Sequence, residues 1–430
     1  MKWSKYNILF KSRRNSCNLL YNLLSGLFME LDDALYEKIN LIRYDINKIN
    51  LLTDSEVTIF VDNKVLVTDD QDEFNKYKLA VLANQYNVND MHLTIAPTQD
   101  CNYRCKYCFE ENRPTIYMNE NIENAIVQFV KKKKIKKLNV CWYGGEPLLS
   151  KGTIYRLSNK FKSIVDNYEA SIVTNGYLLD EDIIKCLDNL KIKYIQITID
   201  GKKNTHNIRR PHVIDTNNYD VIKENIKSLI TFAPHIKLSI RVNVDKNNLD
   251  EFVDVYNEFT LLSKQIHIYP GFIHDTTSSC KNSSCMLSKS EKSAFYEYLY
   301  SKYGIYLDEM VPKLVLSSCM ARSLNSFLIG PNGDMYKCWH HLGEKDKVVG
   351  NVNANKIFFD DALIANFMIK NSISDTSRCN KCKFFVVCGG GCPDLKNIKD
   401  GSYDTCSVFK DNIKLFLEMK HDYLNKLKNI

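Results

Sequence analysis

The sequence predicts an α/β protein built on a parallel sheet of six strands, with a small α+β module before it and a cysteine-rich region after it. Between residues 90 and 275, short apolar runs alternate with helical patterns, as βα units around a parallel sheet do. The 430 residues, 44% hydrophobic and 25% charged, suffice for two or three domains. Fifteen cysteines occur, and their clustering in short spacings indicates metal ligands rather than disulfides.

The first module is expected over residues 1–88. A hairpin is predicted at Leu19–Tyr21 and Leu27–Leu31, and a helix capped by Asp32 should follow through Ile42. A second extended pair is predicted at Val57–Val61 and Val65–Thr68. These elements suit a small winged-helix-like module.

The sheet is expected within residues 89–275. Its predicted strands are His92–Ala96, Leu138–Tyr143, Ser171–Thr174, Tyr194–Ile199, Lys237–Val244 and Gln265–Tyr269. Its predicted helices are Glu120–Lys133, Thr153–Val165, Asp180–Asn189, Tyr219–Phe232 and Leu249–Leu261. Function in such folds resides at the carboxyl ends of the strands.

Three cysteines follow the first strand closely: Cys101, Cys105 and Cys108. Three thiolates can hold a four-iron cluster while leaving one iron open to a small chelating molecule. A zinc knuckle is the alternative, but zinc motifs close a tetrahedron and no fourth ligand follows nearby.

A second motif, Gly144-Gly145-Glu146-Pro147, follows the second strand. Two glycines let a backbone edge approach a ligand closely, and the carboxylate can accept hydrogen bonds from an ammonium group. The alternative is a tight turn with a solvated glutamate.

Together the spacing C-x3-C-x2-C, with Tyr107 before the last cysteine, and the Gly-Gly-Glu-Pro run resemble radical S-adenosylmethionine (SAM) enzymes. The resemblance implies a partial (β/α)6 barrel, a catalytic cluster on Cys101, Cys105 and Cys108, and a 5′-deoxyadenosyl radical. It also implies a set of SAM-binding residues. These are Tyr107, Gly144, Gly145, Glu146, Pro147, Asn175, Thr198 and Arg209, with Arg210 as the alternative to Arg209. Strand-end capping or surface salt bridges remain the alternative for each polar residue.

Seven further cysteines lie between residues 319 and 406, and their spacing resembles the SPASM domain, here 319–430. The resemblance implies two auxiliary four-iron clusters and hence three in all. One would use Cys379, Cys382, Cys388 and Cys406; the other, nearer the active site, would use Cys319, Cys338 and Cys392. A zinc ribbon would leave three of these cysteines unexplained.

The near cluster would keep an open iron, because Met320–Leu328 lacks the further cysteine of fully ligated relatives. Cys280 and Cys285, in the expected linker 276–318, could complete it, although loop thiols without a role are favoured. Cys17, Cys141 and Cys186 are interpreted as small core residues.

SPASM-containing enzymes mostly modify peptides, so the resemblance implies a precursor-peptide substrate and an external one-electron reductant of flavodoxin or ferredoxin type. A maturase of ribosomally made, Cys-containing peptides that forms a thioether or other crosslink is favoured; an anaerobic sulfatase maturase is the alternative. Sulfatase maturases begin close to their cysteine triplet, and they carry an aspartate where Trp339 stands here. A non-catalytic electron carrier would need no SAM pocket.

The net charge of +7 is spread over lysine-rich faces, so nucleic acid is not an expected partner. Neither a signal peptide nor a membrane-spanning run is recognised, and a cytoplasmic protein is expected.

Overall fold

The structure, a computed structural model, describes residues 1–108, 114–273, 285–316, 319–354, 360–370, 377–397 and 405–428. The chain forms two compact units. The first unit comprises Met1–Gln85, Ser288–Ser318 and Asn371–Ile430, and the second comprises Tyr86–Leu287 and Cys319–Lys370.

The second unit is built on a nine-stranded sheet of order β11-β10-β9-β8-β7-β6-β12-β13-β14. The six predicted strands are confirmed as β6 (Asp90–Ile95), β7 (Lys137–Trp142), β8 (Asn167–Thr174), β9 (Ile192–Ile199), β10 (Lys237–Val244) and β11 (His267–Phe272). Neighbours among these six run parallel. The sheet is open, since β11 and β14 are its edges.

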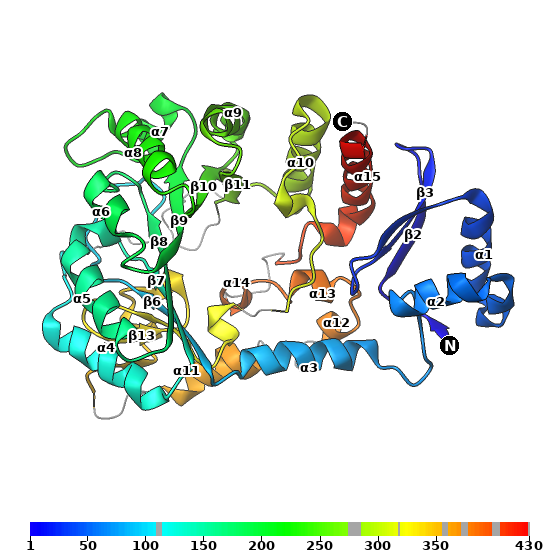
Figure 1. Ribbon diagram of the computed structural model, residues 1–430, viewed down its shortest axis with the longest axis horizontal. Coiled ribbons are helices and arrows are strands. Elements are labelled where there is room, and N and C mark those ends of the chain that lie inside the picture. The colour runs from blue at the N-terminus through cyan, green and yellow to red at the C-terminus, as the bar shows by residue number, and fades with distance from the viewer. Residues whose placement is uncertain are drawn as a thin grey trace. The chain divides into compact units, whose positions relative to one another are not determined.

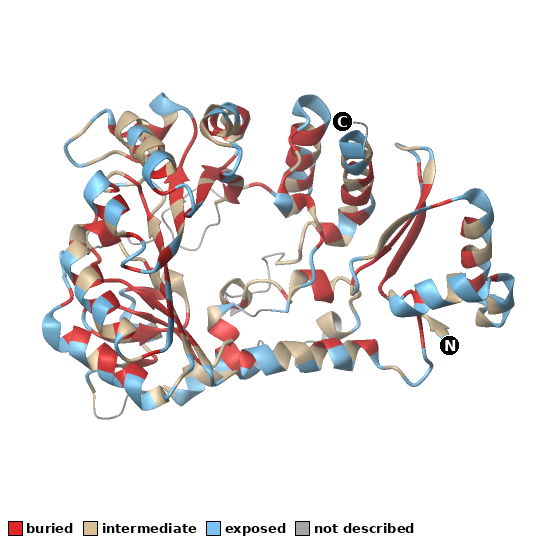
Figure 2. Cartoon of the chain, viewed as in Figure 1, coloured by how far each residue is buried: buried red, intermediate tan, exposed pale blue. Residues whose placement is uncertain are grey.

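Helices lie along one side of this parallel sheet (Figure 1). They are α4 (Glu120–Lys133), α5 (Lys151–Lys162), α6 (Glu181–Cys186), α7 (Lys203–Arg209), α8 (Asn218–Phe232) and α9 (Phe252–Leu262). The side chain of Asn119 caps α4, which buries Ile122, Ile126 and Phe129 on one face. Buried residues accordingly concentrate in the strands and on the inner helix faces (Figure 2).

Three short strands extend the sheet beyond β6: β12 (Ser326–Ile329), β13 (Asp334–Tyr336) and β14 (Gly350–Asn351). β12 pairs parallel with β6, and β13 pairs antiparallel with β12 and β14. The segment expected as one SPASM domain, 319–430, is therefore divided between the units after Lys370.

The first unit contains the antiparallel sheet β2 (Asn7–Ser12), β3 (Cys17–Asn22) and β4 (Phe28–Leu31). This confirms the predicted hairpin. Helix α1 (Asp33–Tyr44) begins where predicted, because the Asp32 carboxylate accepts from the Leu35 amide. Leu20 of the sheet and Ile39 of α1 share one apolar cluster with Phe60.

The predicted second extended pair is wrong at Val57–Val61, which lies within α2 (Asp54–Asp62). The reason is a capping box between Thr53 and Glu56, which starts a helix despite the β-branched residues that follow. The second run of the predicted pair, Val65–Thr68, contains the two-residue strand β5 (Leu66–Val67), which pairs with β1 (Lys2–Trp3).

The remaining helices of the first unit are α3 (Glu73–Gln85), α10 (Lys289–Tyr303), α12 (Ser377–Asn380), α13 (Phe385–Cys388), α14 (Pro393–Asn397) and α15 (Phe409–Lys428); α11 (Asp361–Ala365) is in the second. Short 3-10 turns occupy Ile46–Leu51, Pro147–Ser150, Leu249–Glu251, Asp308–Met310, Met320–Arg322, Trp339–His341 and Lys345–Lys347, and a π turn occupies Asn366–Lys370. The Tyr77 ring of α3 packs on Phe385, with centroids 6.1 Å apart. No helix in the described part of the chain is both long and apolar enough to span a membrane.

Candidate active site

The Gly-Gly-Glu-Pro turn (residues 144–147) docks directly on the cysteine loop (residues 98–108). The Gly145 amide donates to Thr98 O at 3.3 Å, and the Glu146 amide donates to Asp100 O at 2.9 Å. A Cβ atom on Gly144 would lie 2.4 Å from Thr98 O, and one on Gly145 would lie 2.1 Å from Asp100 O. Glycine is therefore required so that the two backbones can meet.

The Glu146 carboxylate joins the end of β7 to the end of β8. Its Oε1 accepts from Thr174 Oγ1 at 2.7 Å and from the Leu148 amide at 3.0 Å, and its Oε2 accepts from the Asn175 amide at 2.8 Å. The residue is fully buried, and this burial raises the pKa of its carboxyl group. The alternative of a solvated glutamate is wrong.

The cysteine loop is held on its other side by residues 209–213. The Arg104 amide donates to Pro211 O at 2.8 Å, and the Lys106 amide donates to Arg209 O at 3.2 Å. Cys101 is buried, whereas Cys105 and Cys108 are half-buried. The loop thus presents three thiols from a backbone fixed by neighbouring strand ends.

Asn102, beside the first cysteine, links the loop to β8. Its Oδ1 accepts from Asn175 Nδ2 at 2.7 Å. Its own Nδ2 is buried without a hydrogen-bond partner among the described residues. A buried unpaired donor at this place suits an acceptor atom of a ligand.

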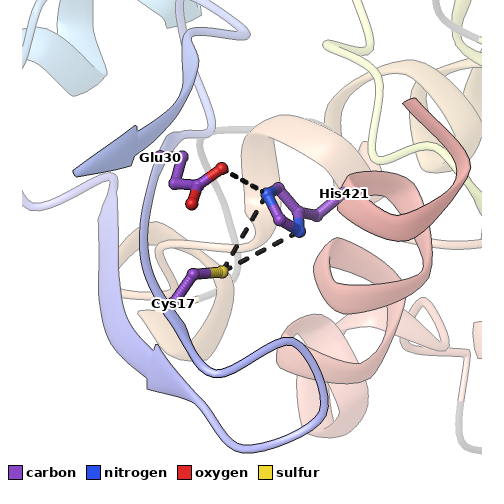
Figure 3. A group of neighbouring side chains, drawn as sticks. All are labelled: Cys17, Glu30 and His421. Carbon is purple, nitrogen blue, oxygen red and sulfur yellow. Dashed lines mark hydrogen bonds and ion pairs between the residues drawn. The ribbon is translucent and has the colours of Figure 1, made fainter. Parts of the chain in front are cut away.

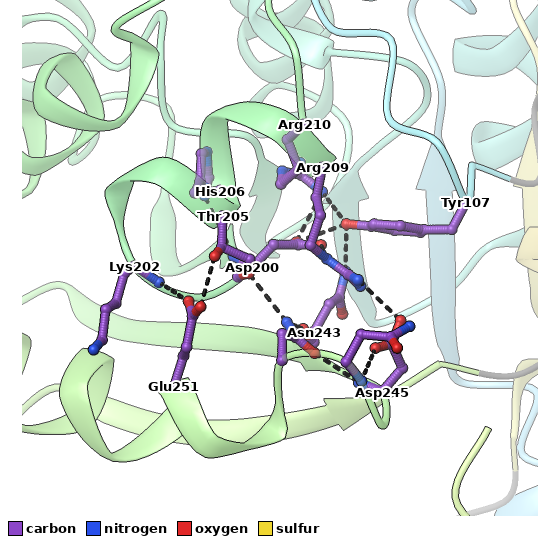
Figure 4. Close-up of polar contacts among 12 residues, drawn as sticks. Tyr107, Asp200, Lys202, Thr205, His206, Arg209, Arg210, Asn243, Asp245 and Glu251 are labelled. Carbon is purple, nitrogen blue, oxygen red and sulfur yellow. Dashed lines mark hydrogen bonds and ion pairs between the residues drawn. The ribbon is translucent and has the colours of Figure 1, made fainter. Parts of the chain in front are cut away.

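The Tyr107 hydroxyl is the centre of a polar network at the ends of β9 and β10 (Figure 4). It donates to Asp200 Oδ1 at 2.7 Å and accepts from Arg210 Nη1 at 2.8 Å and Asn243 Nδ2 at 3.0 Å. Burial raises the pKa of Tyr107 well above its usual value, so the phenol stays protonated and serves as a donor.

Arg209 bridges two buried carboxylates of this network. Its Nε lies 3.1 Å from Asp200 Oδ2, and its Nη1 lies 2.9 Å from Asp245 Oδ2. The Arg209 side chain is 15% exposed and the Asp200 side chain is not exposed, so this is not a surface salt bridge. Arg209 Nη2 and Arg210 Nε are buried with no hydrogen-bond partner in the described ranges.

His206 and Thr198 complete this end of the sheet. The Asp200 amide donates to His206 Nδ1 at 3.3 Å, and burial lowers the pKa of His206 well below its usual value, so the ring is neutral. Thr198 is nearly buried and pairs in register with Arg241, whose Nε donates to Asn243 Oδ1 at 2.8 Å.

The segment around Cys338 also packs on the active-site strands. Trp339 Nε1 donates to Thr94 Oγ1 of β6 at 2.9 Å, and its ring lies on Tyr143 with centroids 4.4 Å apart. A Cβ on Gly343 would lie 2.6 Å from Gln99 Nε2 of the cysteine loop. Trp339 thus fills space beside the Gly-Gly-Glu-Pro turn.

Cys319 and Cys338 belong to the second unit, and Cys392 belongs to the first, so their grouping in one cluster stays a prediction. Cys319 is exposed and Cys338 is half-buried. Between them, Lys337 Nζ donates to Ser323 O at 2.5 Å and to Ser326 O at 2.8 Å. This lysine ties the backbone after Cys319 to the end of β13.

The other cysteines of the C-terminal set lie in the first unit, half-buried: Cys379, Cys382, Cys388, Cys392 and Cys406. The Cys382 amide donates to Cys379 O at 3.0 Å. A Cβ on Gly391 would lie 2.4 Å from Thr405 O. The neighbours of Cys392 and Cys406 in the sequence are therefore in contact. Cys280 lies outside the described residues; Cys285 O accepts from the Lys246 amide at 2.9 Å.

Sequence reasoning missed Asn102 and His206 as members of the site. Asn102 lies inside the cysteine motif, where only the cysteines and the aromatic residue attracted attention. His206 lies in α7, a seven-residue helix without an apolar period. Asn102 could have been predicted from its position, since it is a polar residue between two of the proposed cluster cysteines.

The model of the radical SAM superfamily matches residues 95–259. The chain carries a radical SAM domain. A cysteine-type anaerobic sulfatase-maturating enzyme of Clostridium novyi (strain NT) is 24% identical over 369 residues, which cover 77% of this chain and 95% of the relative. The chain is accordingly an enzyme.

Two solved structures share the fold. A native anSMEcpe structure with bound AdoMet and Cp18Cys peptide is 21% identical, with a TM-score of 0.62, and covers 79% of this chain and 99% of its own. Streptococcus suis SuiB bound to its precursor peptide SuiA is 16% identical, with a TM-score of 0.54, and covers 95% of this chain and 99% of its own.

Replacing Glu146 by glutamine is expected to slow reductive SAM cleavage by about 5- to 150-fold. Whichever way it turns, the amide places an N–H group against the backbone N–H of Leu148 or Asn175, and an unsatisfied buried group costs about 1–3 kcal/mol. The measurement is 5′-deoxyadenosine formed with a strong reductant. Glu169→Gln is the matched control, because Glu169 of β8 is exposed and forms a surface ion pair with Lys137. Equal rates for both variants would contradict the role of Glu146.

Proposed function

We propose that this radical SAM enzyme binds SAM at the carboxyl ends of β6–β10 and modifies a ribosomally made peptide. The observation that carries the proposal is the meeting of the cysteine loop, the Gly-Gly-Glu-Pro turn and the Tyr107 network, joined by hydrogen bonds from several strand ends. Soft thiol donors lie in the same site as N–H groups that are buried and unpaired among the described residues, a combination that suits a cluster with a chelating carboxylate ligand.

Cys101, Cys105 and Cys108 would hold the catalytic four-iron cluster, which supplies the electron that cleaves SAM to a radical able to abstract hydrogen. Asn102 Nδ2, Arg209 Nη2 and Arg210 Nε, each buried and unpaired in the described chain, are the donors available to the SAM carboxylate. Tyr107 and Asp200 together would hold the two arginines in place, because the Tyr107 hydroxyl accepts from Arg210 and Asp200 accepts from Arg209 and from Tyr107. Gly144, Gly145 and Pro147 would shape the pocket, with Asn175 and Thr198 on its strand side.

Two auxiliary four-iron clusters are proposed on the C-terminal cysteines. Cys379, Cys382, Cys388 and Cys406 would hold one, and Cys319, Cys338 and Cys392 would hold the other. The second set leaves an open position, which a soft substrate thiolate suits. An external flavodoxin- or ferredoxin-type protein would supply electrons.

The choice of a ribosomal-peptide maturase rests on two observations. The likeness to SuiB, bound in its structure to a precursor peptide, covers 95% of this chain, against 79% for the likeness to anSMEcpe. Trp339 also occupies the position where sulfatase maturases keep a basic aspartate, and it is engaged with Thr94 and Tyr143. An indole cannot act as a base.

Sulfatase maturation is the second candidate. Its support is the Clostridium novyi relative, matched over 95% of its length, and the higher TM-score of 0.62 for anSMEcpe. Its product would carry an aldehyde instead of a crosslink.

The leader of the precursor peptide is proposed to bind the first unit at a hollow of about 640 Å³ beside β2. The hollow is lined by Phe10, Lys11, Arg13, Arg14, Glu297 and Lys414, among others. Positive side chains outnumber negative ones, and β2 is an edge strand. An extended, acidic peptide segment therefore fits this surface.

Replacing Cys101, Cys105 and Cys108 together by alanine should abolish 5′-deoxyadenosine formation. It should also remove about a third of the iron, because three four-iron clusters amount to about 12 iron atoms per chain. Iron analysis after anaerobic reconstitution measures the loss, and Cys186→Ala serves as the control. If the triple variant still cleaved SAM, the catalytic cluster would be misassigned.

The double variant Arg13→Glu, Lys414→Glu should weaken turnover of an acidic-leader precursor by about tenfold, because it reverses the charge of the hollow. SAM cleavage without peptide should stay unchanged. Lys185→Glu, an exposed charge reversal on α6, is the matched control. Unimpaired turnover by the double variant would place the leader elsewhere.

Mass spectrometry should show the peptide product lighter by about two hydrogens per crosslink, with the crosslinked cysteines blocked to alkylation. Binding of the substrate thiolate at the open position would release the thiol proton and bring the sulfur to the reacting carbon. The 5′-deoxyadenosyl radical would take the hydrogen atom from that carbon, and the auxiliary clusters would accept the remaining electron. An aldehyde product would favour the sulfatase-maturase candidate. Unmodified thiols with a new C–C bond would exclude thioether formation.

A further inference from the structure

Three side chains from distant parts of the sequence meet within the first unit. Cys17 begins β3, Glu30 lies in β4 and His421 lies in α15. Leu19 pairs with Glu30 across the hairpin, and Cys17, two residues before Leu19, points to the same face. Cys17 was predicted to be a small core residue; it is instead half-buried beside a histidine.

The donor atoms of the trio are close together (Figure 3). Cys17 Sγ lies 3.8 Å from His421 Nδ1 and 3.9 Å from Nε2, and His421 Nε2 lies 2.8 Å from Glu30 Oε2. One ligand atom from each residue lies within 4.8 Å of the other two. His421 is buried, whereas the Glu30 side chain is 55% exposed, so the group opens to solvent on the carboxylate side.

We infer that Cys17, Glu30 and His421 form a zinc site. A thiolate, an imidazole and a carboxylate are the donor types that bind this ion. Zinc bond lengths of about 2.0–2.3 Å in a tetrahedron place neighbouring ligand atoms about 3.4–3.6 Å apart. The observed 3.9 Å between Sγ and Nε2 and 2.8 Å between Nε2 and Oε2 need only small side-chain shifts. A water molecule would take the fourth position.

Two neighbouring amides would turn on this ligation, those of Asn15 and of Asn425, whose Nδ2 lies 3.2 Å from His421 Nε2. With zinc on Nε2, the proton of the neutral His421 ring sits on Nδ1, and the side-chain amide of Asn15 lies 3.0 Å from that atom. A flip of this amide, which now donates to Glu418 O at 3.0 Å, would present its oxygen as the acceptor that orients the ring. Glu418 lies one turn before His421 on α15, and its Oε1 accepts a hydrogen bond from Ser12 Oγ of β2 at 2.8 Å. The helix therefore already contacts the same sheet.

The site would join the β3–β4 hairpin to α15 across a separation of 404 residues. It shares no cysteine with the proposed clusters, so it stands apart from the SAM chemistry. Binding would release the thiol proton to solvent and change no oxidation state. Zinc would thus crosslink the N-terminal sheet to α15.

The test uses the full chain with its clusters reconstituted, so that the cluster cysteines are occupied. After incubation with zinc and desalting, elemental analysis should find about one zinc per chain beside the iron. Cys17→Ser and Glu30→Gln should weaken zinc binding by about 100-fold and about 10-fold, with iron content unchanged as evidence of folding. Cys186→Ser, a half-buried cysteine of the second unit, should keep the zinc.

Cobalt(II) gives an independent measurement. Cobalt in the zinc position should show an intense thiolate-to-metal absorption band, which Cys17→Ser should abolish while Cys186→Ser keeps it. Less than about 0.1 zinc per chain, or full zinc retention by Cys17→Ser, would overturn the proposal.

Discussion

The contact between the Gly-Gly-Glu-Pro turn and the cysteine loop is the constraint on which the active site depends. Gly144 and Gly145 bring two backbones into contact, and any side chain at either position would collide with a carbonyl oxygen. The next residue, Glu146, then extends the contact to the end of β8 through two hydrogen bonds, from Thr174 and Asn175. The loop that carries the cysteines is thereby fixed through backbone atoms of the turn after β7, a contact that uses none of the thiols.

The Tyr107 network adds a second constraint of a different kind. Asp200, Asp245 and Arg209 are withdrawn from water, which costs several kcal/mol per ion unless each finds partners. They find them in one another and in Tyr107, while some arginine N–H groups stay unpaired within the described chain. Such an arrangement is poor for stability but suits a binding site, because a carboxylate ligand would complete it.

The sheet was predictable because its strands are apolar runs separated by clear helical patterns; all six were found within a few residues of their bounds. The prediction of a strand at Val57–Val61 was wrong because it relied on the β-branched residues there. The capping box at Thr53 starts a helix instead. The site was predictable only at its motifs. That Glu146 binds strand ends, and that Cys17 meets His421, depends on contacts between distant segments, which no local pattern encodes.

The composition of the first unit changes how the N-terminal module should be understood. Residues 1–85 pack with 288–318 and with the segment from 371 onward. Tyr77 donates to Val315 O at 2.6 Å, and the Val315 amide donates to Val386 O at 2.8 Å, between Cys382 and Cys388. A peptide held on the N-terminal sheet would therefore be bound by the same packed unit that carries five of the auxiliary-cluster cysteines. If the leader and an auxiliary cluster bind as proposed, this shared core would couple the two sites.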